Sequence, residues 1–253
     1  MIKLFIADID GCLAEPYRPF DLDGFARLRA WAARAEAEPA FPRLTVCSGR
    51  AYAYVEAVAQ ALDLRAPALF ESGGGRFDLP LARIRWNPAL TPEVERELDA
   101  VRAFYLEHVT PLDAAFSLDY GKRAQAGIVH PDPAMIARVL PAVRDFVTGR
   151  FPDLHVYHTH VSIDVVPRAL TKVQAIRWLA EEEGVDLGEV AFVGDTVGDA
   201  EAIAAVGLGF APQNAADAAK ASADVVTAGA VLSGVEEAYR ECLALNRARA
   251  DAA

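Results

Sequence analysis

The sequence has few cysteines, and their arrangement fits neither a metal site nor a disulfide framework. Only three occur, Cys12, Cys47 and Cys242, and no two of them have the spacing of a metal-binding or redox motif. This argues against a small secreted domain held together by disulfides. We expect a reducing compartment, with the three cysteines as small buried side chains.

Long apolar runs are also missing. No stretch of about 18 consecutive apolar residues occurs, so a membrane span is not predicted. The sequence passes within a few residues from Met1 into a strand that ends in acids, which does not fit a signal peptide. We therefore expect a cytoplasmic protein without a membrane partner.

Positive charge is scarce. Lys and Arg together number 25 against 36 Asp and Glu, which gives a formal net charge of −11, and no long basic run reverses it locally. Such a chain repels a polyphosphate backbone, so nucleic acid is not an expected partner. A small phosphate monoester remains a possible ligand, because local amides, a few cations and a metal ion outweigh a distant, screened net charge.

The hydrophobic pattern predicts an α/β fold. Short, nearly continuous apolar runs are typical of parallel strands covered on both faces, and they occur at residues 3–7, 44–47 and 190–193. Stretches with one apolar face at helical spacing occur at residues 55–62, 173–180 and 235–245. This alternation predicts a doubly wound parallel sheet with helices on both faces.

The middle of the chain, residues 80–167, follows another pattern. Thr91 and Pro92 are the residue types of a helix N-cap and a first helical position. The periodicities after them predict a helix, two strands, a second helix and two more strands. We therefore predict a compact α+β domain at 80–167, inserted into a core domain formed by 1–79 and 168–253.

Two predicted strands end in residues suited to phosphate chemistry. The first runs into Asp8 and Asp10, with Gly11 allowing a turn, and open α/β sheets bind ligands beyond the carboxyl ends of their strands. The second runs into Ser48 and Gly49, whose hydroxyl and amides can hold a phosphate oxygen. Each pattern alone also fits a structural role, as a solvated turn for the acids and a helix N-cap for the serine.

Two further positions carry charges that suggest a site. Lys172 stands at a predicted helix start, where a cation opposes the helix dipole, although an ordinary surface lysine is an alternative. Asp195 and Asp199 follow the strand at 190–193, and carboxylates at a strand exit suit Mg²⁺. Asp199 could instead cap the next helix. The four positions in this order favour one shared site.

The joint pattern resembles the four motifs of the haloacid dehalogenase superfamily, which here correspond to Asp8-x-Asp10-Gly11, Ser48-Gly49-Arg50, Lys172 and Gly194-Asp195-x-x-x-Asp199. Residues 212–215 and 223–227 extend the resemblance to subfamily IIB, the Cof-type and sucrose-phosphate phosphatase-like group. That group carries a C2-type α+β cap domain between its second and third motifs, where the insert lies here. The resemblance implies a Rossmann-like core with an inserted cap.

The resemblance also implies an activity, that of a phosphatase that hydrolyses a small phosphorylated metabolite such as a sugar phosphate or phosphoglycolate. Asp8 would be the nucleophile that forms an aspartyl-phosphate, and Asp10 the general acid and then the general base. Mg²⁺ is the implied cofactor. A phosphomutase or phosphotransferase of the same superfamily, and a catalytically silent binding module, remain alternatives.

The ligand residues follow from the same resemblance. Ser48, Gly49 and Lys172 would bind the phosphate, and the metal would be held by Asp8, Asp10, Asp195 and Asp199, with Asp10 contributing its backbone carbonyl. Cap residues that could contact the substrate are His158, His160 and Arg123, unless they form only the exposed face of a cap sheet. The two histidines share strand parity, but no third zinc ligand is evident. We expect a monomer or a homodimer.

Three departures from the family pattern stand out. Cys12 replaces the usual threonine, and Gly198 stands where asparagine is common. The segment Glu71-Ser72-Gly73-Gly74 replaces the usual Glu-Asn-Gly. The sequence does not show how the last change affects the substrate.

Overall fold

A five-stranded parallel sheet forms the centre of the computed structural model, which describes residues 1–251. Its strands, in the spatial order β12-β11-β10-β1-β2, are β12 (Val225–Val226), β11 (Leu208–Ala211), β10 (Val190–Val193), β1 (Leu4–Ala7) and β2 (Arg43–Val46). The chain order changes direction at β1, which lies between β2 and β10. Open α/β sheets bind their ligands at such a switch point. The predicted doubly wound sheet is confirmed.

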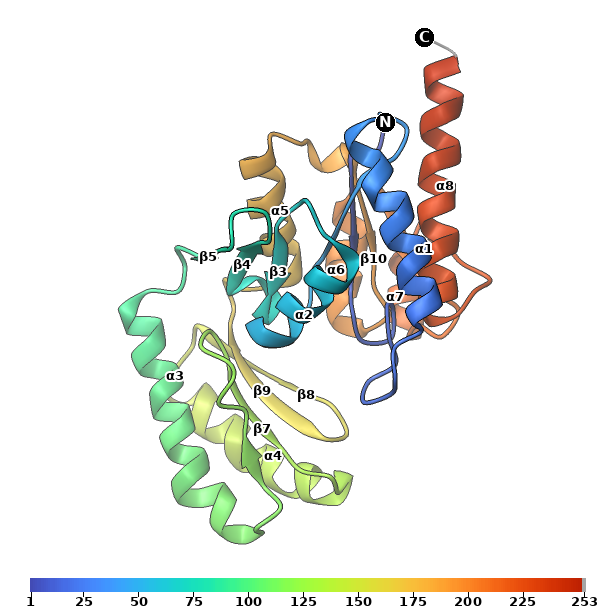
Figure 1. The fold of residues 1–253 in the computed structure, drawn as a ribbon. Helices are drawn as coiled ribbons and strands as arrows, with labels where there is room; N and C mark the ends of the chain where they lie inside the picture. The colour runs from blue at the N-terminus through green and yellow to red at the C-terminus, as the bar shows by residue number, and fades with distance from the viewer. Residues whose placement is uncertain (252–253) are drawn as a thin grey trace.

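Helices cover both faces of this sheet (Figure 1). One face packs against α1 (Leu22–Ala32), α2 (Tyr52–Leu62) and α8 (Val231–Asp251), and the other against α5 (Lys172–Glu183), α6 (Ala200–Ala205) and α7 (Asp217–Ser222). Phe5 and Ala7 of β1 face the first group, and Leu4 and Ile6 the second, as the two-residue period of a strand requires. Within residues 1–251 no helix is long and apolar enough to cross a membrane.

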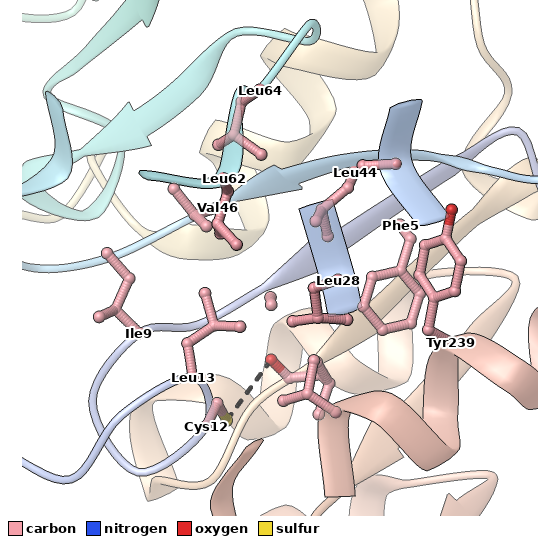
Figure 2. Close-up of a cluster of buried hydrophobic side chains, with 14 of the residues drawn as sticks. Phe5, Ile9, Cys12, Leu13, Leu28, Leu44, Val46, Leu62, Leu64 and Tyr239 are labelled. Carbon is pink, nitrogen blue, oxygen red and sulfur yellow. Dashed lines mark hydrogen bonds between the residues drawn. The ribbon is translucent and has the colours of Figure 1, made fainter. Parts of the chain in front are cut away.

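The core on the α1 and α8 side contains the side chains drawn in Figure 2. The rings of Phe5 and Tyr239 meet edge to face with centroids 5.1 Å apart. The Tyr239 hydroxyl donates to the Pro42 carbonyl at 2.7 Å, so its polar end is satisfied. All three cysteines are buried and free, as expected, and the Cys12 thiol points to the Val193 carbonyl (Figure 2).

A small antiparallel sheet, β3 (Ala68–Phe70), β4 (Gly75–Asp78) and β5 (Arg83–Trp86), stands beside the large one. A bridge between Cys47 and Leu69 joins it to the strand that follows β1 in the sheet order. The turn η2 (Glu71–Gly73) lies between β3 and β4. The sequence did not predict this sheet, because β5 is largely exposed and lacks a buried apolar pattern. Its pairing with β4 crosses the predicted domain boundary after residue 79.

The segment that follows has the predicted order of helix, two strands, helix and two strands. It consists of α3 (Pro92–Phe104), a π-helical turn η3 (Tyr105–Val109), η4 (Thr110–Leu112), β6 (Ser117–Leu118), β7 (Ala126–Val129), α4 (Pro133–Thr148), β8 (Leu154–His158) and β9 (Ser162–Pro167). Thr91 caps α3 by accepting from the Val94 amide at 3.3 Å. We call this segment the cap; its limits at 80 and 167 stay predictions. Figure 1 shows it on one side of the large sheet.

The remaining short turns connect the elements of the core. They are η1 (Ala33–Glu36), η5 (Leu187–Glu189) and η6 (Val197–Asp199). The last of these lies directly after β10 and closes with a capping box between Thr196 and Asp199. This turn fixes the two acids that the sequence singled out at the end of β10.

Candidate active site

Asp8 is the first residue after β1, and it is 4 % exposed. Its amide donates to the Val193 carbonyl at 2.9 Å, so the end of β1 is still held by β10. The Asp8 carboxylate accepts from the Ile9 amide at 2.7 Å through Oδ1 and from Lys172 Nζ at 2.7 Å through Oδ2. Burial raises the pKa of Asp8 to about 7, although Lys172 acts against this rise.

Lys172 is the first residue of α5, with Thr171 as the N-cap. Its Nζ donates to Asp8 and, at 2.5 Å, to Oδ1 of Asp199, which is fully buried. Burial lowers the pKa of Lys172, but the two carboxylates outweigh burial and leave it well above the usual value. The charge of Lys172 is unfavourable beside the positive end of the α5 dipole, but the carboxylates of Asp8 and Asp199 offset this effect.

Asp195 and Asp199 are positioned by the tight turn after β10. Oδ2 of Asp199 accepts from the Asp195 amide at 3.2 Å, from the Thr196 amide at 2.9 Å and from the Thr196 hydroxyl at 2.6 Å. Burial raises the pKa of Asp199, but Lys172 and Thr196 outweigh it, and the pKa is lowered overall. Burial, with the charge of Asp199, raises the pKa of Asp195 to about 6.

Asp8, Asp195 and Asp199 together could hold a metal ion. Each offers a carboxylate oxygen, and the three oxygens lie within 4.8 Å of one another. The turn at Gly11 approaches this group closely, since a Cβ at Gly11 would lie 2.0 Å from Oδ2 of Asp195. Hard oxygen donors suit Mg²⁺, and a cation would offset the mutual repulsion that contributes to the raised pKa values of Asp8 and Asp195. The residues present fit a divalent cation.

Asp10 points to another partner. Both of its oxygens accept from Arg50, one from Nε and one from Nη2, each at 2.6 Å. The Arg50 guanidinium carbon lies 5.0 Å from the ring centroid of Tyr17 and 5.0 Å from that of Tyr54. The carboxylate of Asp10 therefore stays outside the group of three acids. Arg50 belongs to a motif that the sequence singled out, but its role was not predicted.

Ser48 and Gly49 lie at the carboxyl end of β2. Ser48 is 1 % exposed, its carbonyl accepts from the Ser72 amide at 2.9 Å, and its hydroxyl accepts from the Arg50 amide at 3.2 Å. The N-cap of α2 is Ala51, so the alternative of a helix-capping serine is wrong. The structure brings Ser48 to the same edge of the sheet as Asp8, because their strands are parallel neighbours.

A cavity of about 150 Å³ lies beside Lys172, between the core and the cap. Core residues Ser72, Thr171, Thr196 and Gly198 line it with Tyr157 and Val166 of the cap and Leu170 of the connection. Gly198 needs no special backbone there, since a Cβ would meet only Thr196 Oγ1 at 3.5 Å. The departure from asparagine at this position thus widens the cavity without straining it.

The predicted cap residues lie elsewhere. His158 and His160 are exposed near the turn between β8 and β9, and neither belongs to a metal-binding group within residues 1–251. Arg123 Nε donates to Glu95 at 2.5 Å, and its guanidinium lies 4.7 Å from the Trp86 ring centroid. None of the three lines the cavity beside Lys172. Tyr157, next to one of the predicted histidines, lines it instead.

Asn214 is a site residue that the sequence did not predict. Its Nδ2 donates to the Gly11 carbonyl at 2.9 Å, and its Oδ1 accepts from the Val231 amide at 2.7 Å. The amide of Ala216 donates to the Asp195 carbonyl at 2.8 Å. The segment at 212–215 was noticed only for its resemblance to the family. The structure shows that it supports the backbone of both acidic turns.

Comparison with known proteins gives a consistent result. The family model of haloacid dehalogenase-like hydrolases matches residues 124–238. A phosphoglycolate phosphatase of Natronomonas pharaonis is 24% identical over 249 residues, which cover 98% of this chain and 99% of that protein. A haloacid dehalogenase-like hydrolase from Bacteroides thetaiotaomicron has the same fold, with a TM-score of 0.73, 20% identity and coverage of 95% and 99%. Thermoplasma acidophilum 0175 matches with a TM-score of 0.72, 20% identity and coverage of 96% and 98%.

Residues 124–238 of the chain thus match the family of haloacid dehalogenase-like hydrolases. This match agrees with the resemblance found in the sequence, and the solved structures share the predicted α/β fold.

Proposed function

We propose that the chain is a Mg²⁺-dependent phosphatase that hydrolyses a small phosphate monoester through an aspartyl-phosphate on Asp8. The observation that carries the proposal is the surroundings of Asp8. A buried carboxylate at the switch point of the sheet lies 2.7 Å from a lysine and within 4.8 Å of two further acids. A site built only for stability would not collect three acids around one lysine, since unpaired buried charge destabilises a fold.

Asp8 would attack the phosphorus in line with the leaving oxygen. An Asp8 Oδ–P bond forms, and the bond from phosphorus to the leaving oxygen breaks. Asp10 would give a proton to that oxygen and later take one from the water that hydrolyses the aspartyl-phosphate. Ser48, Gly49 and Lys172 would bind the transferring oxygens, and Lys172 would reduce the repulsion between the nucleophile and the phosphate.

Asp8, Asp195 and Asp199 would hold Mg²⁺, with the backbone carbonyl of Asp10 as a further ligand. The bound ion would supply positive charge that offsets the anionic phosphate. The contact from Lys172 to Asp199 also supports a second role for Asp199, which is to orient that lysine. A cytoplasmic location and a monomeric or homodimeric state stay predictions of the sequence.

The substrate class proposed is a small sugar phosphate or a phosphoglycolate-like ester. Relatives named phosphoglycolate phosphatase match nearly the whole chain, at identities of 24% and 25%. The presence of Asp10, which can activate water, favours hydrolysis of the aspartyl-phosphate over a phosphoenzyme that persists. A phosphomutase contains the same pair of acids and would instead form a bisphosphate or a second sugar phosphate.

Replacement of the nucleophile tests the proposal. Asp8→Asn should lower the rate of phosphate release from p-nitrophenyl phosphate and sugar phosphates by about a thousandfold or more, because an amide cannot form the phosphoenzyme. Asp63→Asn is the matched control, since the half-buried Asp63 lies at the C-terminal end of α2, away from the candidate site, with a φ of 52° that asparagine tolerates. Phosphate release should require Mg²⁺ and stop with EDTA.

The alternatives give other outcomes. Unchanged phosphatase activity in Asp8→Asn would contradict the nucleophile assignment. Formation of a bisphosphate in place of inorganic phosphate would favour the mutase. No turnover of any phosphate ester by the unmodified protein with Mg²⁺ would favour the silent binding module.

A further inference from the structure

The cap sheet has one face that its own helices leave uncovered. Ile163 and Val165 of β9 are buried in the cluster formed with α3 and α4, so Asp164 and Val166 point to the other side. Asp164 lies opposite Tyr157 of β8 in the strand register, and residues in such a pair share a face. Tyr157 and Val166 line the cavity beside Lys172. This face of the cap is therefore turned towards the candidate active site.

Asp164 belongs to a group of polar side chains on that face. Lys122 Nζ donates to Oδ1 of Asp164 at 2.7 Å and lies 3.7 Å from Asp119, and the Ser162 hydroxyl donates to Oδ2 of Asp164 at 3.2 Å. The Lys122 side chain is 10% exposed. We call Lys122, Asp119, Asp164 and Ser162 the cap cluster. Its charged groups come from the turn before β7 and from β9.

Two glycines place the cap cluster against the core. A Cβ at Gly127, opposite Asp164 in β7, would lie 2.8 Å from Oδ1 of Asp164, so the ion pair occupies the space of a side chain. A Cβ at Gly121 would lie 3.3 Å from Cβ of Ala51. Ala51 directly follows the motif that contains Ser48, Gly49 and Arg50. The cap cluster thus lies close to the phosphate-binding end of β2.

Folding stability alone does not explain why the cap cluster contains buried charges. Replacing a buried ion pair by apolar residues of similar volume is often neutral or stabilising, because desolvation of the two charges offsets their attraction. Burial lowers the pKa of Lys122, but Asp164 and Asp119 raise it more, so Lys122 is charged. A charged donor and two carboxylate acceptors therefore lie beside the cavity, on the face of the cap sheet from which Tyr157 and Val166 line it.

The charges in this region decide which leaving group fits. Lys122, Lys172 and Arg50 are cations of the cap cluster and the candidate active site, and each already has a carboxylate partner at 2.7 Å or less. A carboxylate on the substrate would compete with those partners and would meet the second acid of the cap cluster, Asp119. Hydroxyl groups can donate to the carboxylates and accept from Lys122 at the same time. Ser72, Thr171 and Thr196 add hydroxyls to the cavity wall.

We propose that the cap cluster, with Tyr157 and Ser72, is the leaving-group site, and that it selects phosphate esters of polyols or sugars over esters whose leaving group carries a carboxylate. The proposal rests on the proposed phosphatase function. It assigns to the cap a preference that differs from the substrate named for the phosphoglycolate phosphatases among its relatives. It also gives the Ser72 departure from the family's asparagine a place in the cavity wall.

The test compares three substrates in the unmodified protein and in Asp164→Asn, all with Mg²⁺. The substrates are glycerol phosphate or a hexose phosphate, phosphoglycolate, and p-nitrophenyl phosphate, which carries no aliphatic hydroxyl. Asp164→Asn keeps the shape of the side chain, and Asp119 remains as a partner for Lys122. A second variant, Lys122→Met/Asp164→Asn, removes both charges of the pair together.

In the unmodified protein, kcat/KM should be higher for the polyol or sugar phosphate than for phosphoglycolate. In both variants, kcat/KM for the polyol or sugar phosphate should fall by about tenfold to a hundredfold, because hydroxyl acceptors are lost. Turnover of p-nitrophenyl phosphate should stay within about twofold. Arg34→Met/Glu38→Gln, which removes an exposed ion pair of the core, is the control and should leave all three substrates unchanged.

The outcomes separate this proposal from the one on which it rests. Turnover of p-nitrophenyl phosphate together with a preference for phosphoglycolate would overturn the leaving-group site alone. An equal loss of all three activities in Asp164→Asn, with an unchanged melting temperature, would also overturn it. No turnover of p-nitrophenyl phosphate by the unmodified protein would overturn the phosphatase function, and the leaving-group site with it.

Discussion

Arg50 holds the carboxylate proposed as general acid and base. Because both Asp10 oxygens accept from the guanidinium, Asp10 cannot give up a proton until at least one of these bonds opens. Cation–π contacts with the rings of Tyr17 and Tyr54 also hold the guanidinium in place. A guanidinium that donates two parallel hydrogen bonds to one carboxylate holds that carboxylate in a single orientation. Arg50 is therefore a positioning residue for Asp10.

Arg50→Met should lower kcat for phosphate release by about tenfold to a hundredfold, because Asp10 loses the orientation that proton transfer requires. The measurement is a double-mutant cycle with Asp10→Asn. If Arg50 acts through Asp10, its replacement should have little further effect in the Asp10→Asn background.

Arg27→Met, which removes an exposed arginine from its buried carboxylate partner Glu236, serves as the control for loss of an arginine–carboxylate pair outside the candidate site. Equal and additive losses from Arg50→Met in both backgrounds would show that Arg50 acts independently of Asp10.

The turn η2 connects the small sheet to the cap through one carboxylate. Glu71 is fully buried, and its Oε2 accepts from the amides of Arg123 at 2.9 Å and Ala124 at 2.5 Å, while Oε1 has no partner among the described residues. Glu71 and Ser72 both have positive φ, at 51° and 55°, a region that residues other than glycine seldom adopt. The contact to the cap and the placement of Ser72 in the cavity wall thus depend on the same strained turn.

Glu71 should make stability depend on pH. Burial raises its pKa above the ordinary 4.5, and the two backbone amides only partly offset the rise. As the pH rises from about 4.5 through the folded-state pKa, the folded protein holds a proton that the unfolded chain has lost, so the free energy of unfolding falls. Glu71→Gln removes this term, and its stability relative to the unmodified protein should increase over that range.

Urea unfolding of both proteins from about pH 4.5 to about pH 8 measures the difference. A difference in the free energy of unfolding that does not vary with pH would contradict the role given to Glu71.

Elements with a buried pattern were predicted well. β10 has the predicted bounds, and Val55, Val58, Ala59 and Leu62 form the buried face of α2 as expected. The first strand expected in the insert is short, Ser117–Leu118, because only these two residues pair with β7. The sheet β3-β4-β5 was missed because β3 and β4 are buried but only three and four residues long, and because the outer strand β5 is largely exposed. Hydrophobic periodicity reports burial, so it cannot report a strand that is not buried.

At the scale of the whole molecule, the sequence predicted the contacts that follow from the parallel sheet. The carboxyl ends of parallel strands meet at one edge, so Asp8, Ser48 and Asp195 had to lie near one another. The pairs Arg50–Asp10 and Lys122–Asp164 join residues 40 and 42 positions apart, and neither has a sequence signal. They depend on how side chains pack between segments, which motif spacing does not specify.

Binding of Mg²⁺ should stabilise the whole fold, because its three carboxylates come from β1 and the turn after β10, which meet only in the folded chain. At a concentration a hundred times Kd, the linkage contributes about 3 kcal/mol. For a chain of this size this amounts to a rise of about 5–10 °C in the melting temperature. Calorimetry with Mg²⁺ and with EDTA checks this.

Asp195→Asn should reduce the rise in melting temperature strongly, since it removes one ligand. The control Asp63→Asn should keep it. A rise of equal size in the Asp195→Asn variant would show that Mg²⁺ stabilises the protein from another site.

The strand order has a consequence for how the chain is made on the ribosome. β1 is synthesised first, yet one of its two neighbours is β10, whose partner residues lie 186 positions later, as in Leu4 and Val190. The cap, by contrast, pairs strands that follow one another closely and can fold as soon as it emerges. During synthesis, Asp8 therefore follows a strand whose β10 neighbour is still missing. Its partners Lys172 and Asp199 are added only later. The candidate active site therefore forms late in synthesis, and a chain released before Lys172 and Asp199 are added would lack it.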